Sequence, residues 1–548
     1  MLVAGKTRLV TVTAFCVIAF IAIAAFTYNP ELTDDSSQYL RKSWSKISNE
    51  QAWLGGGNAP TPPGSASNPQ TPPHDALPFN PAPQLSEPDL PSKNPNPYAA
   101  VNEVTGGDVV DEHTSSISST SSATTSTSTA AAAGLPTAVQ TAVAMPTELA
   151  HNYTEIWSQS TQDGGYFNIN FFGNDNSQAF NPSLLPHPQL HDTWIAVAQA
   201  RYEDRAFPSG WSSELVCNAV FNKGGNLSCT EPPTVLVVPA TQSTHCKDKL
   251  LTLHMNIGPH DARAFFGPEY PYLIYGTQSE HTCFGQWTQD FRLLMDWGIF
   301  RGWDAFQVPT EIQRPPPLGA MEKNYYFFWD MDKVLYAHYD TSPHRAFAKV
   351  ELDGSAGPDL APQVYAKDEA CFNKHLRLNP LPDPKETKSS IHQATNSLSL
   401  TMCNSTDTSC IPNADNTYII AIYQHKVGNG LMHARYEPFV MVMKRRAPFE
   451  IHAITAKPLW IRGRKNRDEM IYITSMNYKA RGMTYTGYLD DIIHVNFGVE
   501  DRRTSSMDVK AGDLVRDLML CDDGSPPVPA GGPALYMGSE ENLGSAPA

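Results

Sequence analysis

Short hydrophobic runs separated by turn residues dominate the chain from about residue 152 onward. Examples are TWIAVAQARYE, YPYLIYGTQS and EMIYITSMNYK, which are rich in β-branched and aromatic residues. Such runs, broken by turn signals about every ten residues, predict many short strands joined in hairpins. Few stretches have a helical period, and the best of them is QWTQDFRLLMDWGIF at residues 286–300. The pattern predicts an all-β body over residues 151–525.

The length of this body favours one all-β architecture over another. A β-sandwich usually needs far fewer residues. A β-propeller repeats four-stranded sheets radially, which accommodates the length and protects the strand edges. No WD or kelch repeat is visible in the sequence. The predicted fold class is therefore an all-β propeller with diverged blades.

The N-terminal region has a different pattern. Leu9 to Tyr28 is a run of 20 residues without a charge, which is long enough to cross a bilayer as a helix. A cleaved signal peptide is the alternative, but its apolar core is usually about 7–15 residues. Lys6 and Arg8 precede the run and acidic residues follow it. The positive-inside rule then predicts a cytosolic tail at 1–8, an anchor at 9–28 and type II topology.

Two further segments lack the composition of a folded core. Residues 29–150 are rich in Pro, Ser and Thr, with almost no large apolar side chains in TSSISSTSSATTSTSTAAAAG. This composition predicts a disordered stalk. Residues 526–548 are expected to form a disordered tail. The stalk would hold the body away from the membrane.

Cysteine usage and glycosylation sequons agree with a body in an oxidising compartment. Of nine cysteines, Cys16 lies in the anchor and eight follow it, and an even number predicts disulfides. Cys403 and Cys410 flank the turn-rich loop CNSTDTSC and are the best local pair. Sequons occur at Asn152, Asn226 and Asn404. Because an anchor of about 20 residues is short for a plasma membrane, a Golgi location is expected.

The overall charge restricts the partners. The formal net charge is −16, whereas a nucleic-acid partner requires a basic surface. An acidic surface with neutral polar and aromatic residues suits an uncharged ligand such as a sugar. The sequence does not predict an oligomeric state.

The stretch GPHDARAFFGPEYPYLIYG places Asp261 and Arg263 at the start of an apolar strand. Residues two apart in an extended segment share one face. In a propeller this pair would point toward the central axis, where a carboxylate held by an arginine could act as a general acid or base. A structural ion pair is the alternative.

The stretch MEKNYYFFWDMDKVLYAHYD contains a second group of candidates. Asp330 and Asp332 could hold a divalent metal, as Asp-x-Asp does in many nucleotide-sugar transferases, but Asp is also a common turn residue, and a hairpin turn is preferred here. If they form the turn, the polar residues at the other end of the two strands become the better site candidates: Glu322, Lys323, Asn324, His338 and Asp340.

Further polar residues lie beside apolar runs, and for each of them a loop or a satisfied core position is the structural alternative. They are Asn181, His392, Gln393, Asn396, His425, Tyr436, Glu437, Asp490, Asp491 and Asp501. Five carboxylates each cap a strand pattern: Asp261, Glu322, Asp340, Glu437 and Asp501. Converging from separate blades, they would form an acidic, aromatic-lined pocket suited to sugar hydroxyls.

Several of these stretches resemble fungal type II membrane proteins associated with the β-1,2-mannosyltransferases of yeast cell-wall mannan. They are FNPSLLPHP, GPHDARAFFGPEYPYLIYG, EKNYYFFWD, IHQATNSLSLTMC, YEPFVMVMKRRAPFEIHAI and GYLDDIIHVNFGVED. The G-x-x-D-x-R element and FGVED are also similar to the five-bladed propellers of β-mannoside phosphorylases and related mannosyltransferases. The resemblance covers residues 165 to 505. Ala262 stands where phosphorylases usually carry Pro, and their full phosphate-binding set is absent, which argues against phosphorolysis.

The resemblance implies a five-bladed propeller that transfers mannose from GDP-α-mannose to a mannan or glycan acceptor with inversion. Asp261 would be the general base, and Arg263 and Lys323 would offset charge on the leaving diphosphate. The mannose and acceptor subsites would be lined by His338, Asp340, Tyr436, Glu437 and Asp501. No cofactor is implied.

Three alternatives remain open. The first is a glycoside hydrolase or phosphorylase acting on β-mannosides. The second is a metal-dependent transferase that uses Asp330 and Asp332. The third is a non-catalytic glycan-binding protein at the cell surface.

Overall fold

The computed structural model describes residues 143–201, 210–295, 305–382, 388–428 and 434–522. The expected anchor, stalk and C-terminal tail lie outside these residues. No helix within the described ranges combines the length and hydropathy needed to span a bilayer. The described part is mostly β-structure, as the hydrophobic pattern predicted.

The largest sheet has nine strands and joins the beginning of the described chain to its end. Its path runs β23 (Ile471–Tyr478), β25 (Ile492–Val499), β26 (Arg503–Lys510), β2 (Phe167–Asn170), β7 (Leu227–Cys229), β6 (Glu214–Phe221), β4 (Trp194–Ala200) and β3 (Ala179–Pro186), with β8 (Thr234–Val235) also on β6. Strand β2 pairs antiparallel with β26, where Phe167 faces Ser506, and parallel with β7, where Ile169 faces Leu227. An early strand therefore links two groups of strands that are distant in sequence.

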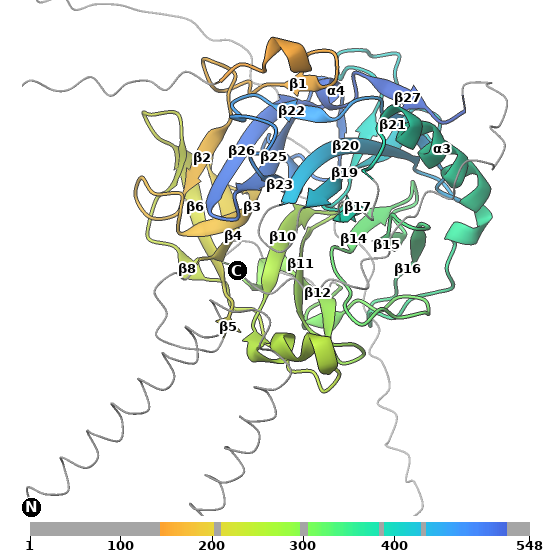
Figure 1. Cartoon of the computed structure of the whole chain (residues 1–548). Helices are drawn as coiled ribbons and strands as arrows, with labels where there is room; N and C mark the ends of the chain where they lie inside the picture. Colours follow the sequence, from red (N-terminus) through yellow and green to blue (C-terminus); the bar gives the residue numbers. More distant parts are fainter. Residues whose placement is uncertain (1–142, 202–209, 296–304, 383–387, 429–433, 523–548) are drawn as a thin grey trace, which may run out of the picture. The chain divides into compact units, whose positions relative to one another are not determined.

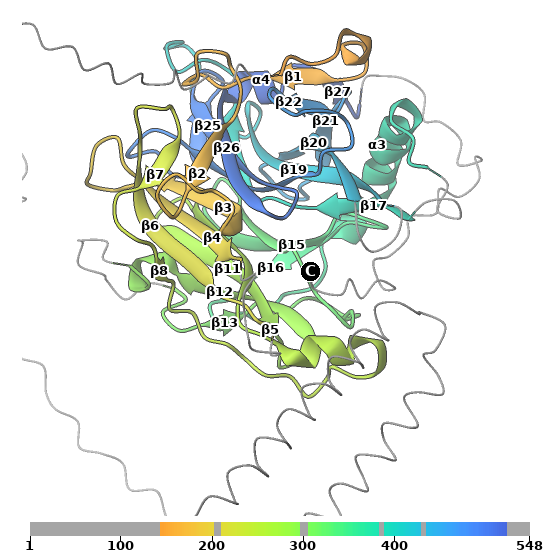
Figure 2. The same ribbon diagram turned by 60° about the vertical axis from the view of Figure 1, so that its left-hand side comes forward.

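Three further sheets contain most of the remaining strands. One is β10 (His260–Phe266), β11 (Pro271–Gln278), β12 (Phe284–Asp290) and β13 (Thr310–Glu311), and the next is β14 (Tyr326–Trp329), β15 (Leu335–Asp340) and β16 (Ala346–Lys349). The third is β24 (Thr486–Tyr488), β18 (Leu398–Thr401), β19 (Thr417–Gly428), β20 (Ala434–Lys444), β21 (Ile451–Thr455) and β27 (Leu518–Leu520), with β17 (Lys388–Gln393) on β19. The sheets follow one another around the described part in chain order (Figure 1, Figure 2).

Two short strand pairs and a few helices complete the described elements. The pairs are β1 (Thr154–Ile156) with β22 (Leu459–Ile461) and β5 (Gly210–Trp211) with β9 (Asn256–Ile257). The helices are α3 (Tyr365–Leu378), α4 (Ala511–Leu514), η1 (Thr147–Leu149), η2 (Asp248–Met255), η3 (Phe291–Leu293) and η4 (Ala361–Gln363). Helix α3 lies at the edge of the view in Figure 1.

The expected helix over residues 286–300 is wrong in its first part, because residues 286–290 belong to β12. Every residue of β12 is buried, since the strand lies between β11 and β13 and its faces pack on neighbouring sheets. A strand buried on both faces shows no two-residue alternation. The lost alternation is what made this stretch look helical.

Hydrophobic clusters fill the spaces between successive sheets. One cluster joins Leu185 and Val197 of β3 and β4 to Leu273 and Trp287 of β11 and β12. Equivalent clusters connect β10 and β11 with β14 to β16, those strands with β19 to β21 and α3, and β19 and β20 with β23 to β26. Because the sheets pack face to face in this order, the position of the first strand of each sheet is set by the neighbouring sheets.

Polar side chains connect the first strands of the sheets to one another. Ser183 Oγ accepts a hydrogen bond from Ala264 N at 3.2 Å, and Asn477 Nδ2 donates to Ala264 O at 3.0 Å. Asn396 donates to Met476 O at 2.8 Å and accepts from Met476 N at 2.9 Å. Strands β3, β10 and β23 also contact one another directly. These bonds satisfy backbone groups at strand edges that would otherwise be buried without partners.

Candidate functional site

Asp261 lies at the start of β10, in a break of the strand register. The pairing of β10 with β11 shifts between His260 and Arg263, which marks a β-bulge of the kind that redirects a side chain. The Asp261 backbone has φ 50°, a left-handed conformation that is uncommon for residues other than glycine. Gln199 Oε1 accepts a hydrogen bond from Asp261 N at 3.0 Å. The bulge therefore sets the direction of the carboxylate.

Asn181 holds one oxygen of this carboxylate. Its Nδ2 donates to Asp261 Oδ1 at 2.7 Å, and Asn181 itself has φ 54° at a register shift between β3 and β4. Gly498 leaves the room that Asn181 needs, because a Cβ at Gly498 would lie 2.4 Å from Asn181 Oδ1. No residue within the described ranges donates a hydrogen bond to the other oxygen, Asp261 Oδ2.

The turn between β25 and β26 adds a second carboxylate. Glu500 and Asp501 both have positive φ, at 58° and 45°. The pKa of Asp501 is raised to about 6, first by burial and then by the negative charges of Asp261 and Glu500. The positive charge of Lys426 lowers this pKa by a smaller amount. Asp501 nevertheless reaches solvent. Asp501 is therefore a solvent-exposed carboxyl whose charge interacts with that of Asp261.

Five of the ten described non-glycine residues with a left-handed backbone lie on the strands and turns of this candidate site. Asn324, which precedes β14, has φ 60° and joins the four residues already described. Such conformations cost about 1–3 kcal/mol each and cluster at functional sites. Their occurrence at the ends of β3, β10 and β25 and before β14 marks this end of the strands as the candidate site.

Glu214, on β6, is fully buried beside the backbone of β10. Its Oε1 accepts a hydrogen bond from Ala262 N at 3.2 Å, and its Oε2 has no partner within the described part of the chain. Burial, followed by the charge of Asp261, raises the pKa of Glu214 well above its ordinary value. The Glu214 carboxyl therefore keeps its proton to a higher pH than an exposed glutamate does.

Arg263 does not share a face with Asp261, contrary to the expectation from spacing. The bulge interrupts the two-residue alternation, and the guanidinium is buried, donating to Ala394 O at 3.1 Å, to Gln286 Oε1 at 3.3 Å and to Tyr325 O. Burial lowers the pKa of Arg263 to about 10, although Tyr472 and Asp261 act in the opposite direction. Its positive charge reaches Asp261 through space and without a hydrogen bond.

His260 is a neutral histidine beside the carboxylate. Gln199 Nε2 lies 3.3 Å from its Nδ1, as does Ser212 Oγ. The pKa of His260 is lowered to about 4, mainly by burial. The charge of Asp261 raises this pKa in part, and the charge of Lys323 lowers it. Lys323 Nζ lies over the Phe284 ring at 5.3 Å, so a lysine and a neutral histidine stand on this side of the site.

A group of rings joins Asn324 to the strands that follow it. His392 Nε2 is 3.2 Å from Asn324 Nδ2 and 3.1 Å from Tyr472 OH. Tyr436 packs against both rings, at centroid distances of 5.7 Å to His392 and 5.0 Å to Tyr472, and Lys426 Nζ lies 5.8 Å from its ring centre. Aromatic faces beside hydrogen-bonding groups suit a sugar ring, and the binding role expected for His392 and Tyr436 stays a prediction.

Two predicted histidines are instead tied into buried pairs. His338 Nδ1 is 2.7 Å from Gln393 Oε1, and Arg345 Nε donates to His338 Nε2 at 3.2 Å. His425 Nε2 is 3.3 Å from His375 Nε2 of α3. Burial lowers the pKa of His338 and of His425 well below the ordinary value, and that of His375 to about 3. All three are neutral.

Three predicted carboxylates hold arginines. Arg314 contacts Glu322 at 3.1 Å and Asp340 at 2.5 Å. Burial lowers the pKa of Arg314, but these two carboxylates raise it, and the overall change is a raised pKa. Glu437 is buried among Arg435, Arg464 and Arg467 at 3.2–3.4 Å and accepts from Tyr153 OH at 3.0 Å. Each of these carboxylates is therefore paired with at least one arginine.

The remaining predicted residues also have structural contacts. Asn396 is bonded to Met476, as described above. Asp490 accepts from Ser405 N and Oγ at 2.6 Å, and Asp491 from Tyr488 N at 2.7 Å. Asp330 Oδ1 accepts from Asp332 N and Val334 N at 2.9 Å, which is the hairpin turn preferred from the sequence. Within the described residues no group of three or more His, Cys, Asp or Glu could hold a metal ion.

The eight cysteines after Cys16 form four disulfides, and Cys403 pairs with Cys410. The other pairs are Cys217–Cys229, Cys246–Cys283 and Cys371–Cys521.

Four residues of the site had not been singled out from the sequence: Gln199, Glu214, His260 and Tyr472. Only His260 carried a local signal, since it adjoins Asp261 in GPHDAR. The others lie inside hydrophobic runs and reach the site through strand pairing.

No protein-family model matches the chain, and no curated protein matches it. Among solved structures, a hypothetical protein from Leishmania major is similar with a TM-score of 0.31 and 11% identity, over 63% of this chain and 90% of that chain. A beta-1,2-mannobiose phosphorylase from Listeria innocua has a TM-score of 0.32 and 11% identity, over 65% and 94%. A GDP-Man-dependent mannosyltransferase from Leishmania mexicana has a TM-score of 0.31 and 10% identity, over 63% and 89%. Because these TM-scores are low, the function proposed below rests on the chain's own residues.

Proposed function

We propose that the protein is an inverting glycosyltransferase that moves mannose from GDP-mannose to a mannan or other glycan acceptor, with Asp261 as general base. One observation supports this role above all. Asn181 fixes Asp261 Oδ1 at 2.7 Å while Oδ2 accepts no hydrogen bond from any described residue, so an oriented carboxylate oxygen remains to take a proton.

The proposed reaction needs only this one base. Asp261 Oδ2 takes the proton of an acceptor hydroxyl, whose oxygen bonds to the anomeric carbon of mannose. The bond from that carbon to the diphosphate breaks, and GDP leaves with the electron pair. A diphosphate leaves without the protonation that a glycosidase must supply. Attack from the opposite side gives the β-linkage.

The surrounding residues divide between donor and acceptor. Lys323 would offset charge on the diphosphate, and Arg263 would contribute its charge from the protein interior. His392, Tyr436 and Tyr472 would hold a sugar ring. Glu322, Asp340 and Glu437 have no role in this proposal, because each of them is paired with an arginine.

The direct test compares the full-length protein with its Asp261→Asn variant in a screen of sugar-nucleotide donors with a mannose oligomer as acceptor. We expect transfer from GDP-mannose by the wild type and a loss of about 10²–10⁴-fold in the variant, the usual contribution of a general base. An unchanged melting temperature would show that folding is retained. Full activity in Asp261→Asn would contradict the assignment.

A second function is favoured by a specific observation, the electrostatic interaction between two neighbouring carboxyl groups, Asp261 and Asp501, which together with burial raises the pKa of Asp501 to about 6. A pair of carboxyl groups, one of them with a raised pKa, is the arrangement that glycosidases use. In that case the protein would be a hydrolase or phosphorylase of β-mannosides. Release of mannose from an oligomer alone, or of mannose 1-phosphate when phosphate is added, would establish it.

The proposal extends to architecture and location. The groups of strands beginning with β3, β10, β14, β17 and β23 would be five propeller blades, with β2 completing the last.

Leu9–Tyr28 would anchor a type II membrane protein of the Golgi, with the body in the lumen. Protection of the body from added protease in sealed Golgi vesicles, lost on adding detergent, is the expected result. Digestion without detergent would contradict it.

A further inference from the structure

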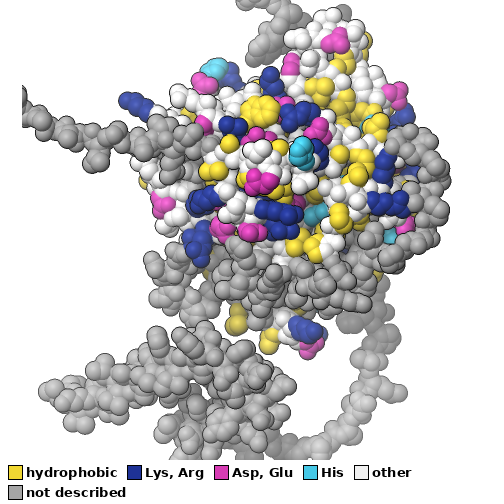
Figure 3. Space-filling model, turned by 45° about the horizontal axis from the view of Figure 1, so that its top comes forward, with side chains coloured by type: hydrophobic (Ala, Val, Ile, Leu, Met, Phe, Trp, Pro, Cys, Tyr) yellow, Lys and Arg dark blue, Asp and Glu magenta, His cyan; other side chains and the backbone are white. Residues whose placement is uncertain are grey.

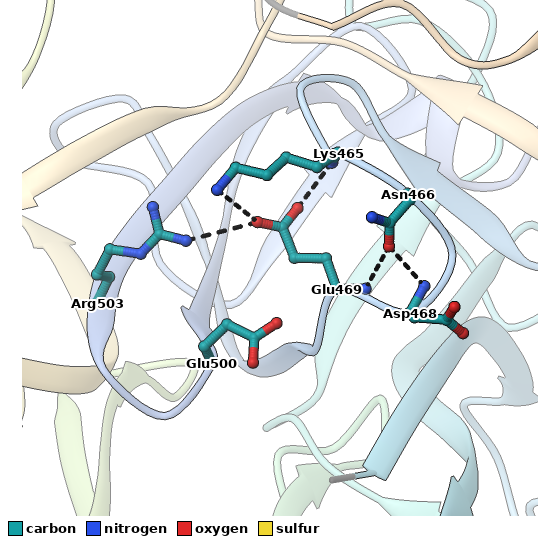
Figure 4. A pocket seen from close by; sticks show the side chains of 6 residues that line it. All are labelled: Lys465, Asn466, Asp468, Glu469, Glu500 and Arg503. Atoms are coloured by element: carbon teal, nitrogen blue, oxygen red, sulfur yellow. Dashed lines mark hydrogen bonds and ion pairs between the residues drawn. The ribbon is translucent and has the colours of Figure 1, made fainter.

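A polar pocket lies between the loop that joins β22 to β23 and the turn that joins β25 to β26. It has a volume of about 370 Å³ and is lined by Lys465, Asn466, Asp468, Glu469, Glu500 and Arg503 (Figure 4). The volume falls within the range of about 300–1,000 Å³ that is usual for small-molecule sites. None of the residues of the Asp261 site described above, apart from Glu500, belongs to its lining.

The loop over residues 462–470 forms one wall and is held by a buried arginine. Arg464 is 2% exposed and donates to Arg467 O at 2.6 Å, to Glu469 O at 3.2 Å and to Glu437 Oε2 at 3.4 Å. Asn466 Oδ1 accepts from Asp468 N and Glu469 N, both at 2.9 Å. A wall fixed in this way loses little conformational entropy when a ligand binds.

The charged groups inside the pocket are already largely compensated. Glu469 Oε1 contacts Arg503 Nη2 at 3.5 Å and Lys465 Nζ at 3.8 Å, and Figure 4 shows its carboxylate between these two cations. Glu500 Oε1 accepts from Met470 N at 2.9 Å. The lining therefore contains two cations and three carboxylates, and no aliphatic or aromatic side chain.

This composition restricts the ligand. An anionic group would meet an excess of carboxylates, and an apolar group would have no hydrophobic partner. The described residues provide no metal site here. A sugar hydroxyl both donates and accepts hydrogen bonds, so it can satisfy carboxylates and cations alike.

The pocket is connected to the candidate active site through a single turn. Glu500 lines the pocket, and the next residue, Asp501, interacts electrostatically with Asp261. We infer that the pocket is a second subsite, which binds a neutral sugar unit of the acceptor glycan one or more units away from the unit that reacts at Asp261. This inference rests on the proposed function, because it assumes that the ligand at Asp261 is a glycan.

Direct binding measurements test the inference without requiring turnover. The affinity of the full-length protein for mannose and for β-linked mannose oligomers of increasing length is measured by calorimetry, in wild type, Lys465→Ala and Arg503→Ala. The ratio of long-oligomer to monomer affinity should rise with length in the wild type. It should fall by about tenfold or more in the variants, which is the effect of losing a hydrogen bond to a charged group. Lys349→Ala, an exposed lysine on β16, is the matched control and should keep the wild-type ratio.

A ratio that does not change with oligomer length, or that is the same in both variants as in wild type, would overturn the inference. If a variant does not fold, amide exchange in the wild type replaces it. A long oligomer, but not the monomer, should then protect the loop over residues 462–470, and equal protection by both would overturn the inference. If longer oligomers bind through this pocket while no donor supports transfer, the proposed transferase function fails and the subsite remains.

Discussion

At the scale of single residues, the orientation of Asp261 depends on side chains that are remote in sequence. Asn181 is 80 residues away and Gln199 is 62 residues away, and they bond the carboxylate and the backbone of Asp261 respectively. A base must be placed accurately, because a displacement of about 1 Å can cost 10²-fold in rate. The partners of Asp261 should therefore affect catalysis without touching the substrate.

Asn181→Ala should lower kcat about 10- to 100-fold for whichever glycan reaction the wild type catalyses, because Asp261 loses the donor that orients it. Gly498→Ala should act in the same direction, since its new Cβ would lie 2.4 Å from Asn181 Oδ1 and displace that side chain. Steady-state kinetics measure both effects. Gly224→Ala, in an exposed turn with its nearest side-chain neighbour at 3.3 Å, is the control and should behave as wild type. Normal kcat in Asn181→Ala would contradict the role given to Asn181.

Glu214 should make stability depend on pH. An unfolded glutamate has a pKa of about 4.3, and burial raises the pKa of folded Glu214 well above its ordinary value. The folded state therefore keeps a proton that the unfolded state loses, and the resulting stability declines as pH rises from about 4.3 through the folded pKa. Glu214→Gln has no such proton. The melting temperature of Glu214→Gln minus that of wild type should increase between pH 4 and pH 8.

Glu351→Gln provides the control for this measurement, because that glutamate is largely exposed. Its difference from wild type should stay constant over the same pH range. A constant difference for Glu214→Gln as well would mean that the buried carboxyl does not hold its proton.

At the scale of elements, hydrophobic runs predicted the strands well, while the left-handed bulges and one helix escaped prediction. Asp261 was identified because a charged residue precedes an apolar strand. Its relation to Arg263 was misjudged, since a bulge has no clear signature in sequence. Helix α3 was missed because its buried face includes Asp368 and His375 along with Cys371, Phe372 and Leu376. Polar residues that pair inside the protein look like surface residues in a sequence.

The disulfide between Cys371 of α3 and Cys521 should contribute more to stability than the local disulfide does. It closes a loop of 150 residues, whereas Cys403–Cys410 closes one of 7. In the chain-entropy picture a longer loop gives the larger stabilisation. Replacing Cys371 and Cys521 together by Ala should lower the free energy of unfolding by about 2–5 kcal/mol. The matched Cys403→Ala, Cys410→Ala protein should lose less, as measured by denaturant titration, and the opposite order would contradict this.

At the scale of the whole molecule, the site is assembled from sheets that are far apart in the chain. Asp261, Asn324 and Asp501 lie near strand ends, and Asn181 lies at the register shift within β3. The sheets are packed face to face in chain order (Figure 2). Sequence alone can identify such residues one at a time, but it cannot show which of them meet. On the face drawn in Figure 3, Lys and Arg side chains are interspersed with Asp and Glu.

If the body lies in the lumen, as proposed, its three sequons should be glycosylated to different extents, because their asparagines differ in exposure. Asn152 and Asn404 are exposed, whereas Asn226 is half-buried and its Oδ1 accepts from Asn168 N at 3.0 Å. When the full-length protein is made in a eukaryotic secretory pathway, Asn152→Gln and Asn404→Gln should each remove one N-glycan. Asn226→Gln should remove less carbohydrate, because that amide is engaged in holding a neighbouring strand. Gel mobility before and after treatment with an N-glycosidase measures these differences. If the enzyme changes the mobility of neither the wild type nor any variant, the body does not face the lumen, and the membrane topology predicted from Leu9–Tyr28 is wrong.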